Sequence, residues 1–175
     1  VTGQTITYSV SNGSMLGSTF YPYSVGTHIV TAQWTGPSNT LTQDLSVTVS
    51  PGQAQTVELS GCDLVVNADT TCDIYATVYD QYSNLVWFDE VGTYSLSSTN
   101  GETEKILPNT PHSQPPQANV LIGRFTGHDV GTWAISITTD AGLTDLIVVE
   151  VSHGAMASLE LIASSNTITA DEVVY

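Results

Sequence analysis

The sequence predicts an all-β fold of antiparallel β-sandwich modules in tandem. Segments rich in Val, Ile, Thr and aromatic residues recur about every eight to twelve residues and are separated by turn residues. No segment of the sequence has the periodicity of an amphipathic helix. Several segments also reappear at a fixed offset, which is typical of a tandem array.

The repeat defines the expected module boundaries. Residues 55–59 (QTVEL) return as residues 157–161 (ASLEL), an offset of 102 residues. Residues 50–52 (SPG) and 152–154 (SHG) stand at the same phase of the repeat. We therefore expect a complete module at residues 53–154, the C-terminal part of a preceding module at residues 1–52, and the first strands of a following module at residues 155–175.

The strands of the complete module are expected at residues 55–60, 64–67, 72–79, 85–88, 92–98, 119–126, 131–139 and 143–151. Apolar and polar residues alternate in the first, and β-branched or aromatic residues dominate the third and the last two. Asn100-Gly101 supplies the positive φ angles of a tight turn after the fifth. The expected core is Val57, Leu59, Ile74, Ala76, Val78, Val86, Leu96, Leu121, Trp133, Ile135, Ile137, Leu146 and Val148. About seven strands in roughly 100 residues are the signature of an immunoglobulin-like antiparallel β-sandwich.

Two short motifs carry a resemblance to a known family. Residues 129–133 (DVGTW) look like the Asp-x-Gly-x-Tyr corner of immunoglobulin-like domains, with Trp133 in the place of Tyr. Residues 77–86 (TVYDQYSNLV) resemble the B-to-C turn of prokaryotic immunoglobulin-like repeats of the invasin and intimin kind. The usual pattern there is Val-x-Asp-x-x-Gly-Asn-Pro-Val, and Ser83 replaces its Gly and Leu85 its Pro.

The resemblance implies a function in architecture. Such repeats build the stalks of adhesins, surface-layer proteins and other long surface chains of bacteria and archaea. We therefore expect a non-catalytic structural or adhesive segment of a long exported protein, acting as a spacer or stalk at the cell surface. Its expected partners are neighbouring modules of the same chain or other copies of the chain, with cell-surface glycans or proteins as further candidates.

Charge excludes several classes of partner. The chain carries 17 acidic and only 2 basic residues, for a formal net charge of -15. A basic surface that neutralises phosphates is missing from such a sequence, so we do not expect nucleic-acid binding. Anionic lipid is disfavoured by the same sign. No apolar stretch approaches the roughly 20 residues that span a bilayer, so we expect no direct membrane insertion.

Cys62 and Cys72 are expected to form a disulfide. They stand ten residues apart on two adjacent predicted strands, and no Cys-x-x-Cys or Cys/His spacing indicates zinc. Ser164 and Val174 occupy the matching phases of the following copy, so the bridge is an accessory of one module. A disulfide indicates an oxidising, extracellular location. The alternative is a pair of reduced, buried thiols.

Residues 102–118 are the candidate contact loop. Tyr94 to Gly131 spans 37 residues, whereas the matching Tyr8 to Gly26 spans 18, which predicts 19 extra residues in this region. The proline density excludes a central strand, and long loops often carry function. A merely solvated loop is the alternative, because long insertions cost little closure entropy. The candidate contact residues are Lys105, Pro108, Pro111, His112, Pro115 and Pro116.

No catalytic residue is expected, and we do not expect an enzyme. His128 beside Asp129 could mimic an oriented base, but the pair belongs to a turn and no Gly-x-Ser-x-Gly elbow is present. On a strand, the adjacent Asp89 and Glu90 would point to opposite faces, so they would not act together on one substrate.

Calcium is the one cofactor that the sequence leaves open. Asp80, Asn84 and Asp89 bracket one predicted turn and are the candidate ligands. They lack the density of an Asp-x-Asp-x-Asp-Gly loop. Asn12 begins an Asn-Gly-Ser sequon and is a candidate glycosylation site, although Asn-Gly is equally a turn signal.

Two further functions remain open. In a self-assembling surface-layer or filament subunit, residues 155–175 of one chain would complete residues 1–52 of another by β-strand complementation. A carbohydrate-binding module would need a row of exposed aromatic side chains. We expect Trp34, Trp87 and Trp133 in the core or at corners instead.

Overall fold

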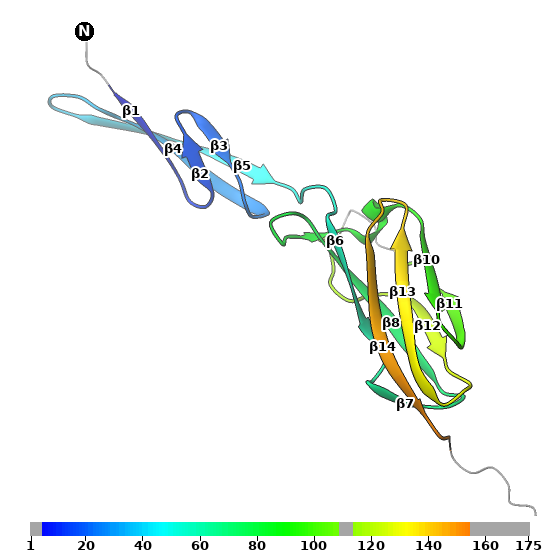
Figure 1. Ribbon diagram of the computed structural model, residues 1–175. Helices are drawn as coiled ribbons and strands as arrows, with labels where there is room; N and C mark the ends of the chain where they lie inside the picture. The colour runs from blue at the N-terminus through cyan, green and yellow to red at the C-terminus, as the bar shows by residue number, and fades with distance from the viewer. Residues whose placement is uncertain (1–4, 109–113, 155–175) are drawn as a thin grey trace, which may run out of the picture.

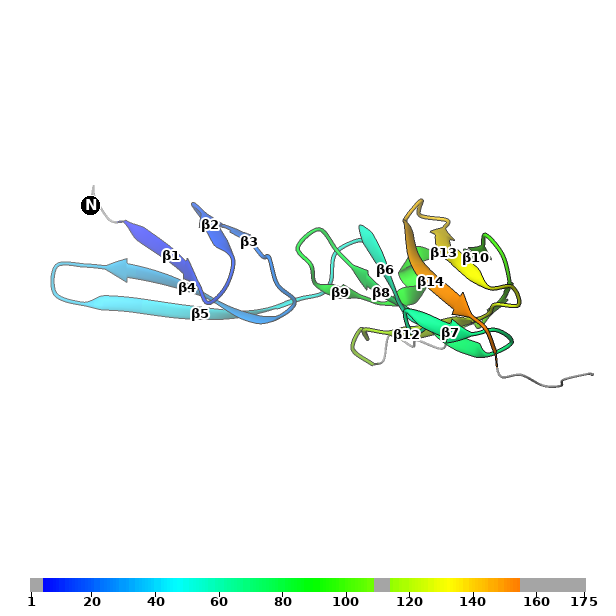
Figure 2. The same ribbon diagram turned by 60° about the horizontal axis from the view of Figure 1, so that its bottom comes forward.

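The structure is a computed structural model that describes residues 5–108 and 114–154. These residues form fourteen strands and one 3-10 helix of four residues, which confirms the all-β prediction. None of the described helical structure is long and apolar enough to cross a membrane. Two groups of strands lie end to end (Figure 1, Figure 2). We call them the head unit, residues 6–49, and the sandwich unit, residues 56–152.

The head unit consists of a three-stranded antiparallel sheet and a hairpin. The sheet has the order β1 (Ile6–Val10), β4 (Gly26–Thr35) and β5 (Thr40–Val49), and the hairpin is β2 (Ser14–Leu16) with β3 (Thr19–Tyr21). The hairpin covers one end of the sheet, where the rings of Phe20 and His28 lie 5.8 Å apart. His28 is buried, and its Nε2–H donates to the carbonyl of Ser24 at 2.8 Å.

The sandwich unit packs two sheets face to face. One sheet has the order β10 (Tyr94–Ser98), β13 (Gly131–Thr139), β14 (Thr144–Ser152) and β7 (Val65–Asn67). The other has the order β11 (Glu102–Lys105), β12 (Val120–Thr126), β8 (Thr71–Tyr79) and β6 (Thr56–Gly61), with β9 (Leu85–Val86) paired to β8. The 3-10 helix η1 (Phe88–Val91) follows β9 and buries Phe88 and Val91. The apolar core fills the space between the sheets.

Most of the predicted core is confirmed, but three residues are wrong. Leu146 and Val148 are 57% and 50% exposed, and Leu121 lies outside the buried cluster. On β14 the odd-numbered side chains point inward, so Val149 and Val151 are buried instead. On β12 a register shift between Leu121 and Gly123 changes the phase of the strand and buries Val120 and Ile122. The confirmed set is Val57, Leu59, Ile74, Ala76, Val78, Val86, Ile135 and Ile137, with Leu96 and Trp133 packed against it.

The strand registers relate the head unit to one half of the sandwich unit. Met15 pairs with Phe20 as Thr103 pairs with Phe125. The three-stranded sheet repeats the β10-β13-β14 arrangement in the same way, with Tyr8 opposite Ala32 as Leu96 is opposite Ile137.

The same correspondence corrects the length of the insertion. Met15 to Thr103 is an offset of 88 and Phe20 to Phe125 an offset of 105, so the sandwich unit has 17 extra residues here. The predicted value of 19 came from matching Tyr8 with Tyr94, whereas the structure matches Tyr8 with Leu96.

One face of the head sheet is open. Residues directly opposite each other on neighbouring strands share a face, which places three mainly apolar rows together. The described residues of the head unit contain no counterparts of β6, β7, β8 and β9. Ile6, Leu41 and Leu45 are therefore 52%, 60% and 62% exposed. We call this surface the open face: Ile6–Trp34–Leu41, Tyr8–Ala32–Gln43 and Val10–Val30–Leu45.

Candidate functional site at the junction of the two units

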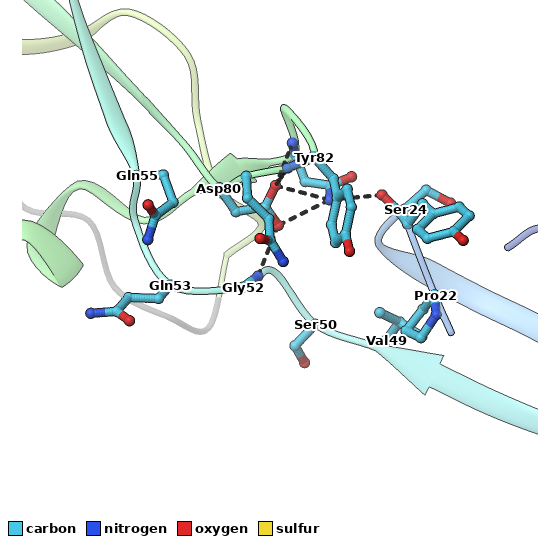
Figure 3. Close-up of a pocket in the computed structure, with 12 residues that line it drawn as sticks. Pro22, Ser24, Val49, Ser50, Gly52, Gln53, Gln55, Asp80 and Tyr82 are labelled. Carbon is cyan, nitrogen blue, oxygen red and sulfur yellow. Dashed lines mark hydrogen bonds between the residues drawn. The ribbon is translucent and has the colours of Figure 1, made fainter. Parts of the chain in front are cut away.

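A pocket of about 360 Å³ lies where the two units meet (Figure 3). Three segments that are distant in the sequence form it. They are the end of the head hairpin with its following loop, the connection after β5, and the turn between β8 and β9. The lining residues are Pro22, Tyr23, Ser24, Val49, Ser50, Gly52, Gln53, Gln55, Asp80, Gln81, Tyr82 and Asn84.

Asp80 organises the turn. Its side chain is buried, and its Oδ1 accepts the backbone N–H groups of Tyr82 and Asn84, both at 2.9 Å. Its Oδ2 accepts the backbone N–H of Gly52 and the side-chain Nδ2–H of Asn84, also at 2.9 Å (Figure 3). Burial alone would raise the pKa of Asp80, but these donated hydrogen bonds outweigh it and hold the pKa below its usual value. The ionised carboxylate therefore joins the turn to the connection between the units.

Asn84 extends this arrangement to the head unit. Its Nδ2–H also donates to the carbonyl of Tyr23 at 3.1 Å, and its Oδ1 accepts the N–H of Val25 at 3.3 Å. The ring of Tyr23 lies 5.3 Å from that of Tyr82, with the planes tilted by 53°. We call Asp80, Asn84 and the contacts that they make with Gly52, Tyr23 and Val25 the junction clasp.

Ser83 explains the resemblance at this turn. It has a φ of 62°, in the left-handed region that favours glycine. Its N–H donates to the carbonyl of Asp80 at 3.0 Å, which closes the turn. The Gly of the family pattern therefore stands at the position where the backbone conformation calls for it.

Two of the three candidate calcium ligands meet in the structure. Asp80 and Asn84 are in direct contact, whereas Asp89 lies in η1 and does not line the pocket. Both carboxylate oxygens of Asp80 face N–H donors, which is the environment of a structural turn. In the described part of the chain no three His, Cys, Asp or Glu side chains are placed to hold a metal ion together. Calcium binding stays a prediction.

The chemistry of the pocket is that of neutral polar groups around one carboxylate. Ser24, Ser50 and the glutamines contribute hydroxyl and amide groups. Among the lining residues no His, Lys or Cys stands beside Asp80. The arrangement can hold the two units together through hydrogen bonds.

His128 and Asp129 lie at the end of the sandwich unit that is farther from the junction pocket, and each residue makes a contact of its own. His128 Nδ1–H donates to Asp69 at 2.8 Å, and this bond raises the pKa of the exposed imidazole, with help from the charge of Glu102. The carbonyl of Asp129 accepts the indole N–H of Trp133 at 2.9 Å, which is the corner that the sequence predicted.

Asp89 and Glu90 follow the strand expected at residues 85–88, and in the structure neither of them lies on a strand. Both residues lie in η1, where strand alternation does not apply. The strand expected at residues 85–88 is shorter in the structure, because β9 ends at Val86 and the chain then turns into the helix.

The candidate contact loop begins with a strand that the sequence did not indicate. Residues 102–105 form β11, which pairs with β12 at the edge of the sheet. Lys105 is the last residue of this strand, and its Nζ donates to the backbone carbonyl of Tyr94 at 2.7 Å. The same Nζ lies 4.1 Å from the centre of the Tyr94 ring, over its face. Burial raises the pKa of Tyr94 to about 12. Lys105 is therefore a structural contact of the sheet edge.

The rest of the loop flanks residues that the structure does not describe. Pro111 and His112 lie outside the described residues. Pro115 is exposed, while Pro108 and Pro116 are half-buried. The carbonyl of Gln114 accepts the indole N–H of Trp87 at 2.8 Å, which ties this part of the loop to the sandwich. A role of these residues in contacts with a partner stays a prediction.

The disulfide is confirmed. Cys62 and Cys72 are bonded across the start of β8 and leave no free cysteine. Asn12 is exposed, and its Nδ2–H donates to the hydroxyl of Ser24 at 2.8 Å. Its glycosylation stays a prediction.

Comparison with known proteins supports the fold. No family model and no curated protein sequence matches the chain. The solved structure of InvD from Yersinia pseudotuberculosis aligns with 97% of this chain and 54% of that chain, at 16% identity and a TM-score of 0.51. The fold is immunoglobulin-like. The chain spans about half the length of that structure.

Two other solved structures align at lower similarity. Domains 4 and 5 of the S-layer protein SbsC align with 83% of this chain and 70% of that chain, at 16% identity and a TM-score of 0.42. A β-glycosidase from Bacteroides vulgatus aligns with 83% of this chain and 21% of that chain, at 12% identity and the same TM-score. Likeness at this level carries no functional conclusion.

Proposed function

We propose that the chain is a non-catalytic spacer or stalk segment of an exported cell-surface protein, in which successive immunoglobulin-like units are held in line. The junction clasp carries this proposal. Units of one chain reorient easily when only a linker joins them. Here a buried carboxylate and one amide side chain connect the head unit, the linker and the sandwich unit.

The hydrogen bonds of the junction clasp suit a rigid connection between the units because they are made to backbone groups. Gly52, Tyr23 and Val25 contribute only main-chain donors and acceptors. The tilted pair of Tyr23 and Tyr82 rings adds an aromatic contact beside them. The disulfide supports an extracellular location. The net charge of -15 supports a surface that is exposed to solvent.

The test compares Asn84→Ala with the matched control Gln81→Ala, an exposed residue of the same turn. We expect Asn84→Ala to broaden the distribution of head-to-sandwich orientations in small-angle X-ray scattering, because the bonds to Tyr23 and Val25 are lost. Gln81→Ala should scatter like the wild type. Circular dichroism verifies that both variants keep their strands. An unchanged distribution in Asn84→Ala would contradict the role of the clasp.

A further inference from the structure

We propose that the pocket between the two units, here called the junction pocket, binds a sugar residue of an uncharged glycan. This binding activity goes beyond the spacer function and is independent of it. The junction clasp connects the two units whether or not the pocket is filled, because its hydrogen bonds are made within the chain.

The place and the size of the junction pocket suit a small ligand. Small-molecule sites in proteins occupy about 300–1,000 Å³ and often lie where two units of a chain meet. The junction pocket has about 360 Å³, and its walls come from the head unit, the connection after β5 and the sandwich unit (Figure 3). A ligand in this pocket would therefore contact both units.

Two tyrosines provide an aromatic wall. Tyr23 and Tyr82 line the pocket and are 44% and 49% exposed. The hydroxyl of Tyr23 shares a hydrogen bond with the hydroxyl of Ser14 at 2.7 Å, which holds the Tyr23 ring in place. A sugar ring has apolar C–H faces, and these faces pack on the flat face of a tyrosine while the phenol hydroxyl stays in contact with water. Exposed rings beside polar groups are therefore suited to a sugar.

Neutral polar side chains line the pocket beside the tyrosines. Ala54 is buried in the core, whereas its neighbours Gln53 and Gln55 are exposed. The backbone N–H of Gln55 donates to the carbonyl of Tyr79 at 2.8 Å, which fixes this segment against β8. Ser50 is exposed in the same connection. Its hydroxyl and the two glutamine amides can each donate and accept hydrogen bonds, as the hydroxyl groups of a sugar do.

The charges around the pocket favour an uncharged ligand. Both carboxylate oxygens of Asp80 already accept N–H groups, so this carboxylate is satisfied without a cation. The residues that line the pocket include no Lys or Arg that would pair with a phosphate, sulfate or carboxylate group. The net charge of -15 also repels anions. An apolar ring face surrounded by hydroxyl groups matches what remains.

The first test titrates isotope-labelled chain, residues 1–175, with the trisaccharides of glucose, mannose, galactose and N-acetylglucosamine. We expect at least one of them to shift the amide signals of Gly52 and Tyr82 in NMR spectra in a saturable manner. Trigalacturonate, an anionic trisaccharide, should shift neither signal. The absence of saturable shifts with every neutral trisaccharide would overturn the proposal. Shifts confined to residues outside the pocket, or equal binding of trigalacturonate, would also overturn it.

The second test removes part of the aromatic wall. Tyr82→Ala keeps the backbone N–H that donates to Asp80, so the turn should be retained. The matched control is Tyr21→Ala on β3, a tyrosine of similar exposure, 45%, that does not line the pocket. We expect Tyr82→Ala to raise the Kd of the trisaccharide that binds best about tenfold and Tyr21→Ala to leave it unchanged. Equal Kd values for the two variants would overturn the proposed site.

The third test removes one amide beside the tyrosines. Gln55→Ala is compared with Gln33→Ala, an exposed glutamine on the side of the head sheet opposite the open face. We expect Gln55→Ala to raise the Kd about threefold, as the loss of one neutral hydrogen bond does. Gln33→Ala should bind like the wild type. Weaker binding in both variants, or in neither, would contradict the assignment of the sugar to the junction pocket.

Discussion

Asp80 illustrates how far a single residue can be understood from its spacing. The sequence shows a carboxylate and an amide four residues apart, which equally describes a cation site and a hydrogen-bonded turn. In the structure its oxygens receive four N–H groups, one of which belongs to Gly52, 28 residues earlier. The sequence therefore located the residue, whereas its partners depended on the path of the chain.

The effect of Asp80 on stability should depend on pH. Because the folded-state pKa lies below the unfolded value of about 3.9, the stabilisation is fully present above that value and is lost as the pH falls through the folded pKa. We expect Asp80→Asn to reduce the free energy of unfolding by about 1–3 kcal/mol at pH 7. The difference from wild type should shrink toward pH 2, as measured by urea unfolding. The exposed Asp63→Asn serves as control, and a pH-independent difference would contradict the interpretation.

The inward-facing side chains were predicted correctly on strands where apolar and polar residues alternate. They were not predicted correctly on strands without this alternation. Residues 146–149 are all apolar, so alternation does not reveal which side chains point inward. Pairing with β13 decides this by placing Ile147 opposite Ile135. β11 was missed because its sequence, Glu-Thr-Glu-Lys, is that of a charged edge strand and carries no apolar signal.

The disulfide provides a prediction at the level of elements. The double variant Cys62→Ser and Cys72→Val introduces the residues that the following copy has at the same phases. We expect it to fold with a free energy of unfolding lower by about 3 kcal/mol, since the bridge closes a loop of about ten residues in the unfolded chain. Denaturant unfolding with and without reductant measures the loss. Complete unfolding of the variant would contradict the view that the bridge is an accessory.

At the scale of the whole molecule, acidity governs how copies of the chain meet. A net charge of -15 makes copies of the chain repel one another. The range of the repulsion depends on salt, because the Debye length falls from about 30 Å at 0.01 M to about 8 Å at 0.15 M.

The amino-acid order alone predicted the all-β class, the tandem repeat, the paired cysteines and most of the sandwich core. These features depend on alternation, turn residues and spacing, which are local properties of the chain. The folded chain was needed to establish the inward phase of β14, the N–H partners of Asp80, the link from Asn84 to the head unit and the exposure of the open face. Each of these depends on which distant strands lie side by side and in which register, and that is set by the packing of the whole chain.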